Sequence, residues 1–302
     1  MINREEIEAF GRIDLIAQQI VQGFITGLHK SPFHGFSVEF AEHRLYNQGE
    51  DTRHIDWRLY GRSEKLFIKQ YEEETNLRCR FLIDTSGSMF YPETKGKTFN
   101  KIEFSAYAIA AFTEMLKRQR DAFGISYFSD EITYHSEIKS TGAHQNFLFR
   151  QLEELLAIGS KQGTNIPAAL HEIAEQAHKR SLIFVFSDMF EQQIREEELF
   201  DALQHLRHNR HEVILFHTVD KHTELELEFG NQPVNFIDLE SGKEIKANPN
   251  QLKKAYRERV NSYVEKLKLR CGQYRIDYVS VDVNEGFNKI LMSYLLKRQR
   301  MM

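Results

Sequence analysis

The chain has 302 residues, of which 41% are hydrophobic and 28% are charged, and this ordinary composition excludes an intrinsically disordered chain. The formal net charge of −4 gives no reason to expect nucleic acid or an anionic membrane as the main partner. The length is enough for one large domain, or for one domain with an appendage.

Neither the cysteines nor the apolar runs indicate secretion or a membrane. Cys79 and Cys271 are the only cysteines, and we expect reduced thiols, as in a reducing compartment, rather than a disulfide. The amino terminus is rich in charged residues, which excludes an apolar signal core. The longest run of small apolar residues, 106–112, is too short to span a bilayer. We therefore expect a cytoplasmic protein without membrane insertion.

The predicted elements begin with a helix over residues 3–29, where Ile13, Ile16, Ile20 and Phe24 recur at helical spacing. Extended segments at 37–46 and 65–70 flank a charged loop. Strands are then predicted near 78–84, 122–128, 131–137, 181–187, 212–218 and 275–281. Helices are predicted near 100–119, 143–157, 166–179, 193–208, 249–270 and 285–298.

This alternation predicts an α/β fold of the Rossmann-like kind, with a doubly wound, mostly parallel sheet flanked by helices. The tight turn at Ser129-Asp130 predicts that the strand near 131–137 is an antiparallel edge strand. We expect the N-terminal helix and extended segments, residues 1–75, to pack on the core formed by 76–302. The charged, turn-rich stretch 220–248 is predicted to be a surface hairpin insertion.

The pentapeptide Asp84-Thr85-Ser86-Gly87-Ser88 directly follows an apolar predicted strand. A carboxylate and two hydroxyls at alternate positions of one tight turn place hard oxygen ligands together, as Mg²⁺ and Mn²⁺ prefer. The same residues are also common turn formers, because Asp and Ser side chains bond their own backbone. The pentapeptide alone leaves both interpretations open.

Two further landmarks lie where the same metal site would need them. Thr164 stands at the start of a predicted helix, and Asp188 follows the predicted strand 181–187. In an open α/β sheet, ligands bind beyond the carboxyl ends of strands where the strand order reverses. If the strands ending at Asp84 and Asp188 are neighbours, these oxygen side chains converge. Because we expect Asp188 to lie at an edge of the sheet and not in the core, we expect Asp188→Ala to leave the fold largely intact.

Asp84-x-Ser86-x-Ser88, followed by Thr164 and Asp188, resembles the metal-ion-dependent adhesion site of von Willebrand factor A (vWA) domains. A second resemblance lies upstream, in the charged signature loop 49–58 together with Arg62-Ser63 and 71–74. These residues resemble the bacterial domain of unknown function 58 family, in which such a signature precedes a vWA-like domain. The likeness covers about residues 36–190, and it departs from the pattern at Glu50, where Asp is usual, and at Met189, where Gly is usual.

The resemblance implies a function as well as a fold. Ser86, Ser88 and Thr164 would bind Mg²⁺ or Mn²⁺ directly, and Asp84 and Asp188 would act through water. A protein partner would supply an Asp or Glu to the metal. The resemblance implies that this partner is a MoxR-type AAA+ ATPase or its client, and that the two proteins act in protein maturation or remodelling. The implied protein is a non-enzymatic interaction module.

Two alternatives stay open: a metal-assisted phosphohydrolase, and a structural scaffold with a vacant metal site. Against catalysis, an aspartyl-phosphate hydrolase would need a second Asp at the position of Ser86. A zinc protease motif opening at His171-Glu172 would need His at the position of Glu175. The signature loop 49–58 also has two interpretations, an ion-pair lattice around Trp57 or a loop that contacts a partner.

Overall fold

The structure is a computed structural model that describes most of the chain. It covers residues 11–29, 43–46, 57–63, 65–69, 77–92, 98–158, 165–190, 196–208, 210–230, 232–237, 239 and 242–301. Thr164, the signature residues 49–56 and the acidic run 71–74 lie outside these ranges.

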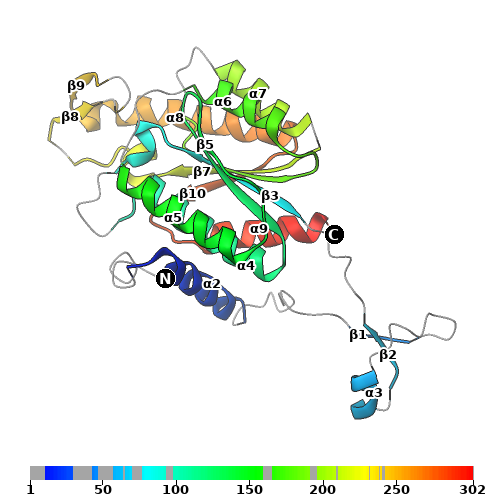
Figure 1. Ribbon diagram of the computed structural model, residues 1–302. Coiled ribbons are helices and arrows are strands. Elements are labelled where there is room, and N and C mark those ends of the chain that lie inside the picture. Colours follow the sequence, from blue (N-terminus) through cyan, green and yellow to red (C-terminus); the bar gives the residue numbers. More distant parts are fainter. Residues whose placement is uncertain are drawn as a thin grey trace.

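A six-stranded sheet forms the centre of the molecule (Figure 1). Its strands are β3 (Arg78–Asp84), β4 (Ala122–Phe128), β5 (Ile132–His135), β6 (Leu182–Ser187), β7 (Glu212–Val219) and β10 (Asp277–Asp282). They lie in the order β10-β7-β6-β3-β4-β5, and all neighbours are parallel except the edge pair β4–β5. The predicted mostly parallel α/β fold is therefore confirmed, with the strand after Ser129-Asp130 antiparallel at one edge.

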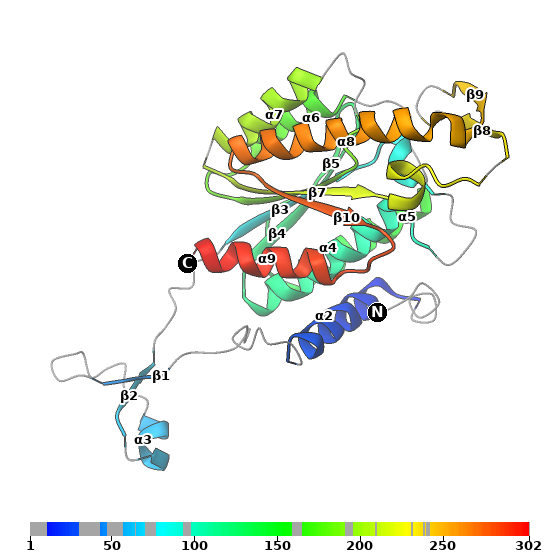
Figure 2. The same ribbon diagram turned by 180° about the vertical axis from the view of Figure 1, so that it is seen from behind.

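Helices cover both faces of this sheet (Figures 1 and 2). One face packs against α4 (Lys101–Arg118), α5 (Gly142–Ile158) and α9 (Asn288–Met301). The other packs against α6 (Ile166–Gln176), α7 (Glu196–His208) and α8 (Pro249–Gln273). Side chains alternate between the faces along each strand, since Phe81 and Ile83 lie in the first core and Leu82 in the second. Strands buried on both faces are the near-continuous apolar runs expected of a parallel sheet.

The helix α2 (Ile13–His29) adds an outer layer over α4 and α5. Its predicted apolar stripe, Ile13, Ile16, Ile20 and Phe24, is buried in the core that α4 and α5 share with the sheet. Within the described residues the helix begins at Ile13, whereas the spacing predicted a start near residue 3. Residues 1–10 lie outside the described residues.

The strand order reverses between β3 and β6. From β3 the chain runs outward through β4 to β5, then returns to β6 on the other side and continues to β7 and β10. The strands β3 and β6 are parallel, with Ile83 opposite Phe186, so their carboxyl ends share one edge. This is the topological switch point at which doubly wound sheets bind ligands.

Several smaller elements complete the described chain. They are β1 (His43–Leu45), α3 (Trp57–Ser63), β2 (Phe67–Lys69), the 3-10 turn η2 (Gly87–Phe90), the π-turn η4 (Lys221–Leu225), β8 (Val234–Ile237) and β9 (Glu244–Ala247). The pairs β1–β2 and β8–β9 are antiparallel. None of the described helices has the length and apolar character needed to cross a membrane. Cys79 and Cys271 are buried free thiols.

The segment between β8 and β9 reaches the turn that follows β3. A Cβ atom added to Gly87 would lie 2.8 Å from the carbonyl oxygen of Leu239. Real Cβ atoms do not approach backbone oxygens so closely, so only glycine fits at position 87 without displacing Leu239. The stretch 220–248 thus borders the pentapeptide found in the sequence.

Candidate metal centre

The turn after β3 is tied to its own backbone and to β4. Asp84 Oδ1 accepts a hydrogen bond from the Ser86 amide at 2.9 Å, which is the local turn chemistry that the sequence left open. The amide and hydroxyl of Thr85 both donate to the carbonyl oxygen of Phe128, at 2.8 and 3.0 Å. The turn is therefore held rigidly at the end of the sheet. These hydrogen bonds leave other oxygen atoms of Asp84, Ser86 and Ser88 available to further groups.

The two serine hydroxyls point to the same place. Ser86 Oγ and Ser88 Oγ lie 3.1 Å apart, close enough for a hydrogen bond and for binding to one ion. Ser86 is buried, and Ser88 is half-buried. The alternate spacing of the two serines thus produces the neighbouring pair of oxygens that the sequence predicted.

Asp84 is linked to the neighbouring strand. Its Oδ2 accepts a hydrogen bond from the Ser187 hydroxyl at 2.6 Å, across the switch point. Burial, together with the nearby charge of Asp188, raises the pKa of Asp84 from 3.8 to about 7. This side chain is therefore a carboxylate in an environment that disfavours its negative charge, and a bound cation would relieve that.

Asp188 lies at the end of β6 and is buried. Its Oδ1 accepts from the amide of Phe190 at 3.2 Å, and its Oδ2 accepts from Lys101 Nζ at 2.7 Å. The backbone carbonyl of Asp188 accepts from His217 Nε2 at 2.8 Å. Both the side chain and the main chain of this residue are therefore fixed by neighbours.

Met189 explains how the strand end tolerates a residue other than glycine after Asp188. Its φ is +52°, in the left-handed region that glycine adopts more readily. The amide of Met189 donates to Ser187 Oγ at 2.9 Å, and its carbonyl accepts from the Tyr263 hydroxyl. Its side chain is buried in the core beneath α6, α7 and α8. These contacts hold the left-handed backbone without a glycine.

His217, on β7, supports this strand end as a neutral group. Burial lowers its pKa to about 4, which outweighs the opposing influence of Asp188. With Nε2 donating to the Asp188 carbonyl, Nδ1 is the nitrogen that accepts from Tyr278, whose hydroxyl oxygen is 2.7 Å away.

Lys101 and Glu224 also belong to the site, although the sequence did not predict them. Lys101 Nζ contacts both Asp188 and Glu224, and its side chain is fully buried. Burial by itself would lower the pKa of Lys101, but the charges of Asp188 and Glu224 raise it above its ordinary value. One signal was available: Lys101 opens α4, where the helix dipole disfavours a cation.

Four of the five predicted ligands therefore meet at one edge of the sheet. Asp84, Ser86 and Ser88 follow β3, and Asp188 follows the adjacent β6. Thr164, the fifth, lies outside the described residues. Its neighbour Asn165 is the N-cap of α6, and the Asn165 amide donates to the carbonyl oxygen of Ser129, which follows β4, at 3.4 Å.

The donor set fits a hard divalent cation. The grouped side chains offer carboxylate and hydroxyl oxygens, which suit Mg²⁺ and Mn²⁺ better than softer ions. When ionised, the three carboxylates of Asp84, Asp188 and Glu224 leave two negative charges after the ammonium of Lys101 is counted. One divalent cation would balance these two charges in a largely buried site, where charges are poorly screened.

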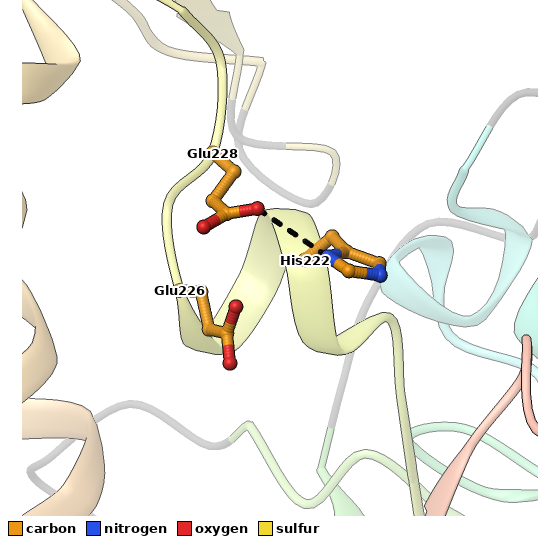
Figure 3. Close-up of side chains that lie close together, drawn as sticks. All are labelled: His222, Glu226 and Glu228. Carbon is orange, nitrogen blue, oxygen red and sulfur yellow. Dashed lines mark hydrogen bonds and ion pairs between the residues drawn. The ribbon is translucent and has the colours of Figure 1, made fainter.

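A second group of possible metal ligands lies nearby, on η4 and the residues after it. The side chains of His222, Glu226 and Glu228 gather there with their ligand atoms within 4.8 Å of one another (Figure 3). His222 Nδ1 is 3.4 Å from Glu228 Oε2. Lys221 lies 3.8 Å from Glu226, and Lys253 lies 3.5 Å from Glu228. These contacts account for the group as a solvent-accessible cluster of ion pairs.

Comparison with known proteins identifies one matching family model. The model described as "Protein of unknown function DUF58" matches residues 42–266. That range includes the strands β3, β4, β6 and β7, both serines, and both aspartates of the candidate site.

The similar curated proteins carry no assigned activity. Uncharacterized proteins of Mycobacterium tuberculosis and Mycobacterium bovis are each 22% identical over 180 residues. The match covers 60% of this chain and 56% of those proteins, so the chain matches little more than half of their length.

Two solved structures are similar at low identity. The conserved hypothetical protein BatB from Bacteroides thetaiotaomicron is 16% identical, covers 75% of this chain and 100% of its own, and has a TM-score of 0.48. An aerotolerance-related membrane protein from Bacteroides fragilis is 19% identical, with 70% and 99% coverage and a TM-score of 0.44.

Proposed function

We propose that this chain, which belongs to the DUF58 family of proteins of unknown function, is a non-enzymatic interaction module whose protein binding depends on a divalent metal. The site is a metal-ion-dependent adhesion site of the vWA type, with Mg²⁺ or Mn²⁺ as its ion. The partner is a MoxR-type AAA+ ATPase or its client, in protein maturation or remodelling.

One observation carries the proposal. Two hydroxyls and two carboxylates, from Ser86, Ser88, Asp84 and Asp188, meet beyond the carboxyl ends of β3 and β6, at the switch point of a doubly wound sheet. Such a convergence requires two chain segments about a hundred residues apart to end at the same edge. Local turn formation by the pentapeptide explains neither Asp188 nor its position.

The chemistry of the ligands favours binding over hydrolysis. Serine hydroxyls are neutral ligands, so an ion held mainly by Ser86 and Ser88 keeps its attraction for an outside carboxylate. When bound, the metal would supply a Lewis-acidic position that an Asp or Glu of the partner fills. Asp84 and Asp188 balance its charge, and the Ser187 hydroxyl keeps Asp84 oriented toward the site.

The position from which an aspartyl-phosphate mechanism would supply its acid is occupied by a serine. Ser86, two residues after Asp84, cannot protonate a leaving group as a second aspartate would. The ammonium of Lys101 is already committed to Asp188 and Glu224. These positions favour the interaction module over the metal-assisted phosphohydrolase.

Thermal unfolding with and without metal tests the proposal. The protein is heated in EDTA, in Mg²⁺ and in Mn²⁺, next to a Ser86→Ala/Ser88→Ala double variant. A ligand that binds only the folded state at a hundredfold excess over Kd stabilises it by about 2.7 kcal/mol. We expect the unfolding midpoint of the wild type to rise with metal, and that of the double variant to stay unchanged.

A pull-down with a purified MoxR-type ATPase, with and without chelator, then tests the partner. We expect wild-type protein to retain the ATPase only with metal present. Equal midpoints in EDTA and metal, together with chelator-independent capture, would favour the scaffold. Metal-dependent release of phosphate from p-nitrophenyl phosphate that Asp84→Asn abolishes would instead favour the phosphohydrolase.

A further inference from the structure

We infer that Lys101 and Glu224 set the strength of metal binding at this site, as an internal cation and an internal anion that act in opposite directions. The inference rests on the proposed function, because it concerns the same site. Neither residue belongs to the five predicted ligands, and they are 123 positions apart in the chain.

The position of Lys101 is unfavourable for a lysine, because it is buried and lies at a helix start. Only the contacts of its ammonium with two carboxylates favour it. Its side chain is 0% exposed, although lysine is almost never fully buried without a charged partner. It also occupies the first position of α4, where the positive end of the helix dipole disfavours a cation. The helix does not need it there, because the Asn100 side chain and Glu103 already form a complete capping box.

Hydrogen bonds to neighbouring residues hold Glu224 in place. Its Oε2 accepts from the amide of Asp220 at 2.7 Å, while Oε1 contacts Lys101. Asp220 in turn caps η4 by accepting from the Thr223 amide at 3.2 Å. The hydroxyl of Tyr256, on α8, donates to the Glu224 carbonyl oxygen at 2.7 Å. The turn that carries Glu224 is therefore supported by α8, and it holds the Glu224 carboxylate against Lys101.

Because of these positions, Lys101 and Glu224 should have opposite effects on the affinity of the site for a cation. The Lys101 ammonium lies 2.7 Å from Asp188 Oδ2, so it repels any divalent ion that this carboxylate attracts. Glu224 neutralises part of that repulsion by pairing with the same ammonium. Removing the ammonium should strengthen metal binding, and removing the Glu224 charge should weaken it. A structural ion pair with no influence on the site would give neither effect.

Manganese titration of matched variants tests this inference. Free Mn²⁺ is measured by electron paramagnetic resonance, at pH 8 and fixed ionic strength, for wild type, Lys101→Met, Glu224→Gln and the double variant. We expect the Kd to fall about tenfold or more in Lys101→Met and to rise about tenfold or more in Glu224→Gln, since poorly screened charges act at short range. The double variant, which has the wild-type net charge, should return toward the wild-type Kd.

Lys268→Met is the matched control, because that lysine is 61% exposed on α8 and should leave the Kd unchanged. Near-ultraviolet circular dichroism checks that each variant is folded, and Glu224→Gln, the near-isosteric change, decides the matter if Lys101→Met unfolds. Equal Kd values in the wild type and in the folded single variants would overturn this inference and leave the proposed function standing. If no protein in the series bound Mn²⁺, the proposed function and this inference would both fail.

Discussion

The Ser187 hydroxyl donates a hydrogen bond to Asp84 Oδ2 at 2.6 Å, and this bond joins the ends of two strands that are not consecutive in the chain. The same oxygen of Ser187 accepts from the Met189 amide at 2.9 Å. One buried hydroxyl therefore orients a ligand carboxylate of β3 and shapes the strand end that carries Asp188.

Ser187→Ala should lower the free energy of unfolding by about 2 kcal/mol, because it removes a hydrogen bond to a buried carboxylate and leaves a buried amide without its acceptor. Urea unfolding at pH 8 in EDTA measures the loss. Ser293→Ala is a suitable control, because the Ser293 hydroxyl bonds only within its own helix, to the Ile290 carbonyl. Equal losses in the two variants would show that the Ser187–Asp84 hydrogen bond contributes no more to the free energy of unfolding than an ordinary hydroxyl bond within a helix.

Asp84 should make metal-free stability depend on pH. Its pKa is about 7 in the folded protein, chiefly because it is buried, against 3.8 for an ordinary aspartate. Between these values the folded state holds a proton that the unfolded state has lost. The contribution of Asp84 is therefore most favourable below pH 4 and is lost as the pH rises through 7.

Asp84→Asn isolates this effect, because His217 and other buried histidines titrate identically in both proteins. The stability difference between Asp84→Asn and the wild type, measured in EDTA by urea unfolding, should grow in favour of the variant from pH 4 to 7.5. With saturating Mn²⁺ the order should reverse near pH 8, because the Asp84 carboxylate balances the charge of the bound ion and the asparagine amide does not. A pH-independent difference in EDTA would contradict the role of Asp84 burial.

Asp188→Ala should be strongly destabilising, contrary to the expectation that Asp188 lies outside the core. Asp188 is buried, and its removal leaves the Lys101 ammonium with Glu224 alone. Breaking a buried ion pair by removing one partner costs about 3–5 kcal/mol. Adding Lys101→Met to Asp188→Ala should recover part of that loss. A double-mutant cycle of urea unfolding measures the coupling, and additive losses would show that the pair is unimportant.

Gly87→Ala should disturb the contact between the site turn and the segment that joins β8 and β9. The added methyl would lie 2.8 Å from the carbonyl oxygen of Leu239, so one of the two backbones must move. Such overpacking typically costs about 1–3 kcal/mol. Gly23→Ala is the control, because that glycine lies on the exposed side of α2 and an added methyl would meet nothing within 4 Å. Thermal unfolding should show a lower midpoint for Gly87→Ala and a slightly higher one for Gly23→Ala.

The periodicity of the sequence was sufficient to predict the strands of the central sheet, the helices that cover it and the fold class, whereas it did not predict the short helix α3. Short apolar runs such as 181–187, rich in aromatic and β-branched residues, are typical of strands buried on both faces, and the helical stripes between them supply the covering layers. The turn at Ser129-Asp130 likewise predicted the antiparallel edge pair β4–β5, because a connection so short cannot cross over to a parallel strand. These features depend on residues near one another in the chain.

The chain by itself also determined which oxygen side chains end β3 and β6, namely Asp84, Ser86, Ser88 and Asp188. Only the tertiary structure decided that β3 and β6 are neighbours, and that Lys101 and Glu224 enter the same edge. The physical reason is that burial and strand order depend on the whole chain. A lysine at a helix start and a glutamate in a charged turn look like solvent-exposed residues until packing removes the water around both.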